Sequence, residues 1–460
     1  MSAGLDLIVH GGTVVLPDAV RRADLGIAGG RIAAIDGDLG RDAPELIDAS
    51  GMHVLPGAVD AHVHLNAPGR SGWEGFASGT AALAAGGTTT FVDMPLNAIP
   101  PTTTAAAFDA KLAESKGSAR IDFALWGGLV PGNVDEMDEL VARGVVGFKA
   151  FMCDSGMDEF PACDEETLRA GMARAAKYGR LVAVHGEDDA LVAEMAARAA
   201  REGAVGARAF LASRPPAAEL AAIELGLALA RDTGCSLHVV HVSTGRGVAL
   251  VAEARAAGVD VTCETCPHYL VLTEEDLERL GAVAKCAPPL RPAAEREALW
   301  AAIVDGTLPM VASDHSPCPP EMKEGDLLSA WGGIAGAETM LTLLLDQGHH
   351  ARGIALKRIV DLVAGFPARR FGLAAKGRIE VGADADLALV ALEERHVLRR
   401  EDLRTRHRLN PFVDRPLRGR VVGTVLRGAA VAANPGATDP PSGRFVRPNF
   451  VQPEPLEEPR

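Results

Sequence analysis

The chain has 460 residues, with 46 Lys and Arg against 61 Asp and Glu, so its formal charge is −15 at pH 7. This acidic balance argues against nucleic acid or an anionic membrane surface as a partner and favours a small-molecule substrate. The seven cysteines lack disulfide-framework spacing, the first residues show no signal-peptide pattern, and no apolar run approaches a membrane span, so we expect a soluble cytoplasmic protein.

Short β-like runs fill the first part of the chain, among them "LDLIVH", "TVVL" and "RIAAID". Gly, Asp and Pro separate these runs, which is typical of small antiparallel strands. We therefore assign residues 1–55 to the N-terminal part of a small β domain.

From about Pro56, Ala-rich helical stretches alternate with short apolar runs such as "TTTFVDM", "LVAVHG" and "LHVVHVS". Alternation of this kind over about 300 residues indicates βα units around a parallel sheet. Its length and number of repeats favour a (β/α)₈ TIM-like barrel over residues 56–375.

The punctuated strand pattern returns in "GRIEVGADADLALVAL" and "RGRVVGTVLRGAAV". Residues 376–433 are thus expected to complete the small domain, as a β-sandwich built from both chain ends. The Pro-rich tail, residues 434–460, should lack regular structure and run extended or wrap a neighbour.

Ionisable side chains recur where the barrel strands are expected to end. In "AVDAHVHLN" two histidines are two residues apart, so they point to the same face of a strand. The later strands add one residue each, and at the mouth of a barrel the full set would meet. Imidazoles with a carboxylate are a transition-metal ligand set. The candidate ligands are His62, His64, Lys149, His185, His241 and Asp314.

Lys149 is the unusual member of this set, because it lies in the apolar run "VVGFKAFMC". A buried ammonium costs several kcal/mol unless it is paired or neutralised, so a lysine here needs an explanation.

Other polar residues have weaker cases. His238, three residues before His241, should face the opposite way and lie in the core or between barrel and helices. The "CETC" run of Cys263 and Cys266 has no second cysteine pair, which disfavours a structural zinc or a redox dithiol. For His268 and His315, substrate roles and ordinary loop hydrogen bonds stay open.

With these residues in view, the chain resembles the cyclic amidohydrolases, which include hydantoinases, dihydroorotases and allantoinases, over about residues 5–432. The similarity is greatest to the allantoinase group, through the segments "SGWEGFASG", "VDMPLN", "CETCPHYL", "AKCAPPLR", "SDHSPCPPEMK" and "WGGIAG".

The resemblance implies two divalent metal ions per chain, bridged by a hydroxide and by an N-carboxylated Lys149. His62, His64, Lys149 and Asp314 would hold one ion, and Lys149, His185 and His241 the other. Zinc is the first choice, with cobalt, manganese or iron as alternatives. Asp314 would be the catalytic proton carrier, and the assembly a homotetramer.

The resemblance also implies a reaction, the opening of the hydantoin ring amide of allantoin to give allantoate in purine breakdown. Asn66 stands where dihydroorotases have an arginine, and an amide suits a neutral ureide. Asn66, Arg70 and Ser316 are the implied substrate contacts, although Ala67 replaces the usual Glu beside them. A hydantoinase or dihydropyrimidinase is the alternative enzyme, and a non-catalytic assembly protein of the same fold is the alternative from another class.

Overall fold

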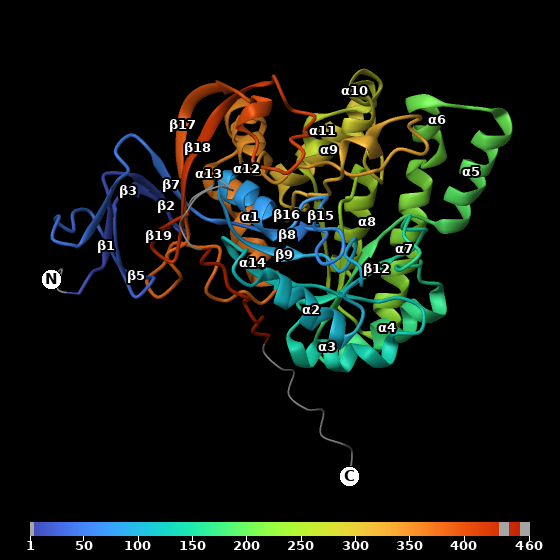
Figure 1. Cartoon of the computed structure of the whole chain (residues 1–460), viewed down its shortest axis with the longest axis horizontal. Coiled ribbons are helices and arrows are strands. Elements are labelled where there is room, and N and C mark those ends of the chain that lie inside the picture. The colour runs from blue at the N-terminus through green and yellow to red at the C-terminus, as the bar shows by residue number, and fades with distance from the viewer. Residues whose placement is uncertain (1–3, 432–440, 451–460) are drawn as a thin grey trace, which may run out of the picture.

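A closed ring of parallel strands forms the larger part of the computed structural model, which describes residues 4–431 and 441–450 (Figure 1). β10 and β11 share one of eight strand positions, since only Trp126 separates them and they pair with β9 and β12 respectively. The ring closes where Val63 pairs with His315. The predicted (β/α)₈ barrel is thereby confirmed. Its strands are β8 (Ala58–Val63), β9 (Thr88–Asp93), β10 (Asp122–Leu125), β11 (Gly127–Gly128), β12 (Gly147–Phe151), β13 (Leu181–His185), β14 (Leu237–Val239), β15 (Val261–Thr265) and β16 (Met310–Val311).

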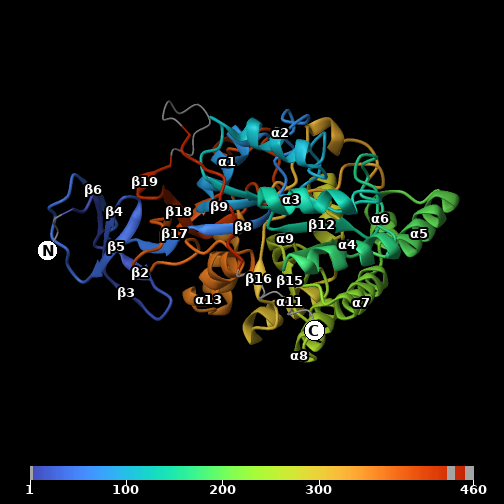
Figure 2. The ribbon, with the colours of Figure 1, turned by 90° about the horizontal axis from the view of Figure 1, so that it is seen from below.

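Helices follow the strands and cover the outside of the barrel (Figures 1 and 2). They are α1 (Phe76–Ala85), α2 (Ala105–Ser115), α3 (Met137–Arg143), α4 (Glu165–Lys177), α5 (Asp189–Glu202), α6 (Gly206–Ser213), α7 (Pro216–Thr233), α8 (Gly245–Ala256), α9 (Pro267–Val271), α10 (Glu274–Leu280), α11 (Ala293–Asp305), α12 (Met340–Leu343), α13 (Leu356–Val360) and α14 (Phe366–Arg370). Three helices, α5 to α7, lie between β13 and β14, and α5 and α6 extend farthest from the small domain (Figure 1).

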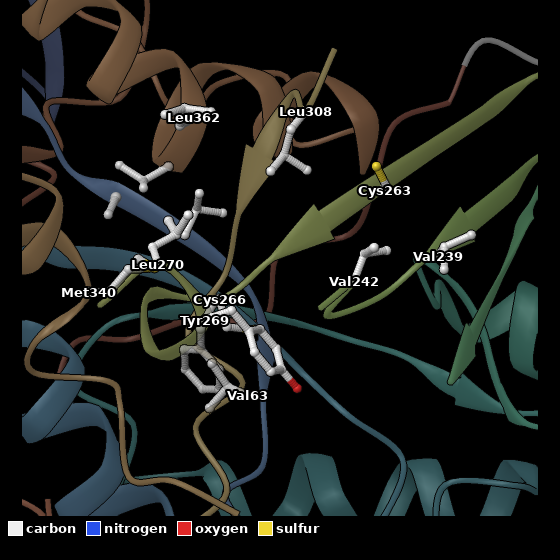
Figure 3. Close-up of a cluster of buried hydrophobic side chains, with 14 of the residues drawn as sticks. Val63, Val239, Val242, Cys263, Cys266, Tyr269, Leu270, Leu308, Met340 and Leu362 are labelled. Atoms are coloured by element: carbon white, nitrogen blue, oxygen red, sulfur yellow. The ribbon is translucent and has the colours of Figure 1, made fainter. Parts of the chain in front are cut away.

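Side chains of the barrel strands alternate between two apolar layers. Val239 on β14 and Cys263 on β15 belong to the layer between the strands and the helices (Figure 3). Ala183 and Trp126 belong to a second cluster that fills the barrel interior. This alternation follows from the two-residue period of a strand, and it sends the polar residues between these positions inward.

The small β domain is a two-layered sandwich, with a sheet in the order β5-β4-β1-β6 against one in the order β19-β18-β17-β7-β2-β3. Leu25, Val54 and Leu387 lie in the apolar cluster of this domain, so its core uses both ends of the chain, as predicted. Its strands are β1 (Leu7–His10), β2 (Thr13–Val15), β3 (Val20–Arg22), β4 (Asp24–Ala28), β5 (Arg31–Asp36), β6 (Glu45–Asp48), β7 (His53–Pro56), β17 (Leu387–Val397), β18 (Pro416–Leu426) and β19 (Ala429–Ala430). Most pairs are antiparallel, but β1 with β6 and β2 with β7 are parallel. The chain crosses from the first sheet to the second twice, from β1 to β2 and from β6 to β7, and both crossings run in the same direction.

A buried lysine joins the barrel to the small domain. Lys376 Nζ lies 2.6 Å from Asp122 Oδ2, 2.9 Å from Asp384 Oδ2 and 2.8 Å from Asp386 Oδ2. Asp122 opens β10, whereas Asp384 and Asp386 precede β17. Arg427 adds a second cation beside Asp122. The three carboxylates could hold a metal by their spacing, but the ammonium already lies among them.

Part of the Pro-rich tail packs against the barrel of its own chain. Residues 441–450 are mostly extended, and Val446 N donates to Phe123 O over 2.7 Å. The Phe445 ring lies edge-on to Phe108 at 5.6 Å. This segment is extended as expected; the remaining tail residues, 434–440 and 451–460, lie outside the described residues.

Candidate metal centre

A cavity of about 480 Å³ lies where the barrel strands end. Its floor brings together all the candidate ligands from strands far apart in the sequence, and its other walls come from α5, α6 and residues 328–332. The candidate ligands lining it are His62, His64, Lys149, His185, His241 and Asp314.

His62, His64 and Asp314 form one group. Asp314 Oδ1 lies 3.2 Å from His62 Nε2 and 3.4 Å from His64 Nε2. The Nδ1 atoms of these rings face Glu264 Oε1 at 2.5 Å and Leu96 O at 2.8 Å. The Leu96 carbonyl can only accept, so His64 Nδ1 carries the proton and its Nε2 presents a lone pair; an ionised Glu264 would fix His62 in the same tautomer. Two lone pairs and a carboxylate oxygen at such distances repel one another unless a cation lies between them, so this group fits a metal ion.

His185 and His241 form a second group. His185 Nδ1 lies 3.0 Å from His241 Nε2, and His185 Nε2 lies 2.8 Å from Glu187 Oε2. Burial alone would raise the pKa of Glu187, but the ion pair with Arg214 lowers it to about 2. The ionised Glu187 accepts the Nε2 proton, which leaves Nδ1 of His185 free to bind a metal. Nδ1 of His241 is buried without a hydrogen-bond partner.

Lys149 lies between these groups on β12, and its side chain is fully buried. Nζ has no hydrogen-bond partner and lies 5.1 Å from the centre of the Phe151 ring. Burial lowers the pKa of Lys149 to about 7, although the nearby Asp314 and Glu264 carboxylates oppose the shift. A neutral amine is therefore accessible near pH 7.

Three residues at this end of the barrel have left-handed backbone conformations. The φ angles are 63° at Asn66, 41° at His241 and 44° at Asp314. Such conformations cost about 1–3 kcal/mol in residues other than glycine and cluster at functional sites. Here they turn the chain just after β8, β14 and β16, which aims two candidate ligands at the cavity.

His238 corrects one expectation. Its Nε2 lies 3.2 Å from Glu264 Oε2 and its Nδ1 lies 2.8 Å from Thr262 Oγ1, inside the barrel. It does not face away from His241, because the left-handed turn at His241 breaks the strand alternation on which that expectation relied. Glu264 thus bridges His238 and His62.

Sequence reasoning missed Glu264 and Glu187 as partners of the imidazoles. Glu264 is the second residue of the "CETC" run, and its side chain is 1% exposed. The available signal for Glu264 was an ionisable residue within an apolar strand, as it was for the lysine of "VVGFKAFMC". Glu187, two residues after His185, gave no comparable pattern.

The expected substrate contacts lie at different depths. Ser316 lines the cavity, whereas Asn66 and Arg70 are not among its lining residues. Asn66 donates from Nδ2 to Pro317 O over 3.1 Å and accepts from Asn97 Nδ2 over 3.1 Å. Asn97 itself lines the cavity, so Asn66 supports the wall rather than forming it. Arg70 lies over the Trp73 ring at 4.7 Å.

The remaining candidates are buried and do not line the cavity. Cys263 lies in the apolar layer on β15 and Cys266 beyond the end of that strand, next to Tyr269 (Figure 3). In the described part of the chain no potential metal group contains both cysteines, although Cys266, His268 and Asp314 approach one another. His315 lies 3.8 Å from the buried Glu74.

All seven cysteines are buried and free. Among the described residues, none of the helices combines the length and apolar character needed to cross a membrane.

Comparison with known proteins places this geometry among hydrolases. A family model described as the amidohydrolase family matches residues 53–431. The chain is 58% identical to an allantoinase of Rubrobacter xylanophilus, over 97% of this chain and 98% of that protein, and 50% identical to an allantoinase of Deinococcus radiodurans, over 97% and 100%. Among solved structures it resembles an L-hydantoinase (dihydropyrimidinase) from Arthrobacter aurescens, with a TM-score of 0.93 and 35% identity over 96% of this chain and 100% of that one.

Proposed function

This chain belongs to the amidohydrolase family, and we propose that it hydrolyses the hydantoin ring amide of allantoin to give allantoate. The observation that carries the proposal is the meeting of six candidate ligands in one cavity, within a chain at least half identical to two allantoinases. A protein of this fold without catalysis would not need that set.

We propose two divalent metal ions as cofactors, zinc first, with cobalt, manganese or iron as alternatives. His62, His64 and Asp314 would hold one, His185 and His241 the other, and an N-carboxylated Lys149 would serve both. The unpartnered Lys149 Nζ supports this assignment, because buried nitrogens without partners are rare in finished sites. His185 Nδ1 and His241 Nε2, which face each other over 3.0 Å, are the ring nitrogens that would hold the second ion. Bound there, such ions supply acidified water and polarise the ring carbonyl.

The chain's own residues then handle the protons. Asp314 Oδ1, which already faces two imidazole Nε2 atoms, would take a proton from the attacking water and return it to the leaving ring nitrogen. Glu264 and Glu187 would hold the tautomers of His62 and His185 through the reaction. Ser316 and Asn97, which line the cavity, would orient the ring.

The proposal is tested by kcat/KM for allantoin, hydantoin and dihydrouracil, measured side by side on metal-replete protein with bicarbonate present. We expect allantoin to be the preferred substrate. Negligible turnover of allantoin would contradict the proposed activity.

A second candidate function is that of a hydantoinase. It is favoured by apolar residues that line the cavity, Val192 and Ala196 of α5 and Phe210 of α6, which suit a hydrocarbon substituent on the ring. Preference for an aryl- or alkyl-substituted hydantoin in the same assay would support it.

We also propose a cytoplasmic homotetramer. Buried free cysteines suit a reducing compartment. Light scattering in solution tests the assembly, and a monomeric mass would contradict it.

A further inference from the structure

Three residues that line the cavity carry a buried side-chain nitrogen without a hydrogen-bond partner: Lys149, His241 and Trp331. The first two belong to the candidate metal centre, where Lys149 Nζ would be carboxylated and the His241 ring would bind an ion through the Nε2 that faces His185. Trp331 Nε1 is not explained in this way, because an indole N–H only donates and does not bind cations. Buried donors are almost always paired with protein, water or ligand, and Trp331 lines the cavity, so an acceptor oxygen of a bound molecule is a candidate partner for this N–H.

The backbone that carries Trp331 is fixed from behind by two lysines. Lys285 Nζ donates to Ala330 O over 2.5 Å, and Lys323 Nζ donates to Trp331 O over 2.9 Å. Both lysines are largely buried, and Trp331 N donates to Met322 O over 2.8 Å. The wall on both sides of the indole is therefore held in place before a ligand arrives.

The indole ring itself is fixed by a second tryptophan. Trp73 meets it edge-on, with ring centres 5.0 Å apart and an angle of 77° between the planes. Trp73 is held in turn by the Arg70 guanidinium. The two tryptophans come from the "WEG" and "WGG" segments, which are far apart in the sequence; Trp331 lines the cavity and Trp73 packs against it.

We propose that Trp331 Nε1 donates a hydrogen bond to the carbonyl oxygen of a ureido substituent on the substrate ring. This assignment rests on the proposed function, in which the ring amide lies over the candidate metal centre and the substituent extends toward the walls. Other wall residues carry side-chain donors that already bond within the chain, whereas Trp331 Nε1 has no partner. These residues are Ser155, Ser213, Lys285 and Ser329. Trp331 would then make the enzyme selective for hydantoins whose substituent carries an acceptor oxygen.

The test combines two enzymes with two substrates. Wild-type protein and Trp331→Phe, both metal-replete, are assayed with allantoin and with 5-propylhydantoin, which keeps the ring but has no oxygen in its substituent. Phenylalanine preserves an aromatic ring against Trp73 and removes only the donor and part of the ring volume. We expect kcat/KM for allantoin to fall about tenfold, as for one neutral hydrogen bond lost from a buried site, and kcat/KM for 5-propylhydantoin to change less than about twofold.

Trp73→Phe serves as the matched control, because Trp73 contributes packing to the same pair without being the proposed donor. It should change both substrates alike. Metal content equal to that of the wild type, together with turnover of 5-propylhydantoin by the same preparation, shows that each variant is folded.

Equal losses on both substrates in Trp331→Phe, or no loss on either, would overturn the assignment of Trp331 while leaving allantoin hydrolysis intact. A wild-type protein that hydrolyses 5-propylhydantoin but not allantoin would overturn the proposed function itself, and the Trp331 assignment with it. The two failures are therefore distinguishable.

Discussion

Replacing Lys149 by methionine should stabilise the metal-free protein, even though it removes the side chain that the proposed centre needs. Lys149 Nζ is buried without a partner, and burial lowers its pKa from 10.5 to about 7. The unfolded chain keeps the ordinary pKa, so at pH 7 folding carries an electrostatic cost of at most about 4 kcal/mol. Methionine has a similar length and no charge, so the variant avoids this cost.

The assay is calorimetric unfolding of chelator-treated protein in CO₂-depleted buffer, at a fixed scan rate. Below the folded pKa of about 7 the ammonium is charged in both states, so the advantage of the variant is complete there. As pH rises toward 10.5 the amine becomes neutral in the unfolded chain as well, and the advantage should disappear. We therefore expect a higher Tm for Lys149→Met at pH 7, with the two curves meeting near pH 10.

Lys111→Met is the matched control. Lys111 is also buried, but its Nζ donates to Asp93 Oδ2 over 2.5 Å and to Met94 O over 2.8 Å. Removing it leaves Asp93 buried and unpaired, which should cost about 3–5 kcal/mol. The change in stability relative to the wild type must have opposite signs in the two lysine variants. A loss of stability in both, or a gain at Lys149 that does not depend on pH, would refute the account of Lys149 as an unpaired ammonium.

Three further outcomes are expected. Lys149→Ala should lose most bound metal and activity, with partial rescue by a short carboxylic acid; wild-type activity without the acid would contradict a bridging role. Glu264→Ala should weaken metal binding about 10- to 100-fold in chelator competition. The control, Glu338→Gln, changes a buried carboxyl that accepts a hydrogen bond from Arg404 N, and it should leave metal binding unchanged. Truncation after residue 440 removes the Phe445 contacts with the barrel and should lower Tm; an unchanged Tm would show that the tail adds no stability.

The barrel could be predicted from the local alternation of strand and helix patterns. The two-ended sandwich could be predicted because the strand pattern of the N-terminal segment returns near the C-terminus. The ligand candidates followed for the same reason, since His185 and Lys149 lie within the strands that carry them. An ionisable residue in an apolar run can be noticed without any knowledge of its contacts.

What could not be predicted depends on how the ring closes. Glu264 comes from β15, which supplies no candidate ligand, and it meets His62 from β8 only because the barrel brings these strands' side chains inward. The sequence also does not show that Asn97, rather than Asn66, lines the cavity. These two amides are 31 positions apart and bond to each other only in the folded chain. Trp73 and Trp331 meet in the same way.

The ammonium of Lys376 has a consequence for attempts to recombine such proteins. Its three carboxylate partners come from β10 and from the segment before β17, so neither part of the molecule carries the whole set. A chimera that joins this barrel to the sandwich of a relative separates Asp122 from Lys376, Asp384 and Asp386, which come with the sandwich. Exchange of modules should succeed only when the positions equivalent to Asp122 and Asp386 are transferred as a unit with Lys376, whatever linker is chosen.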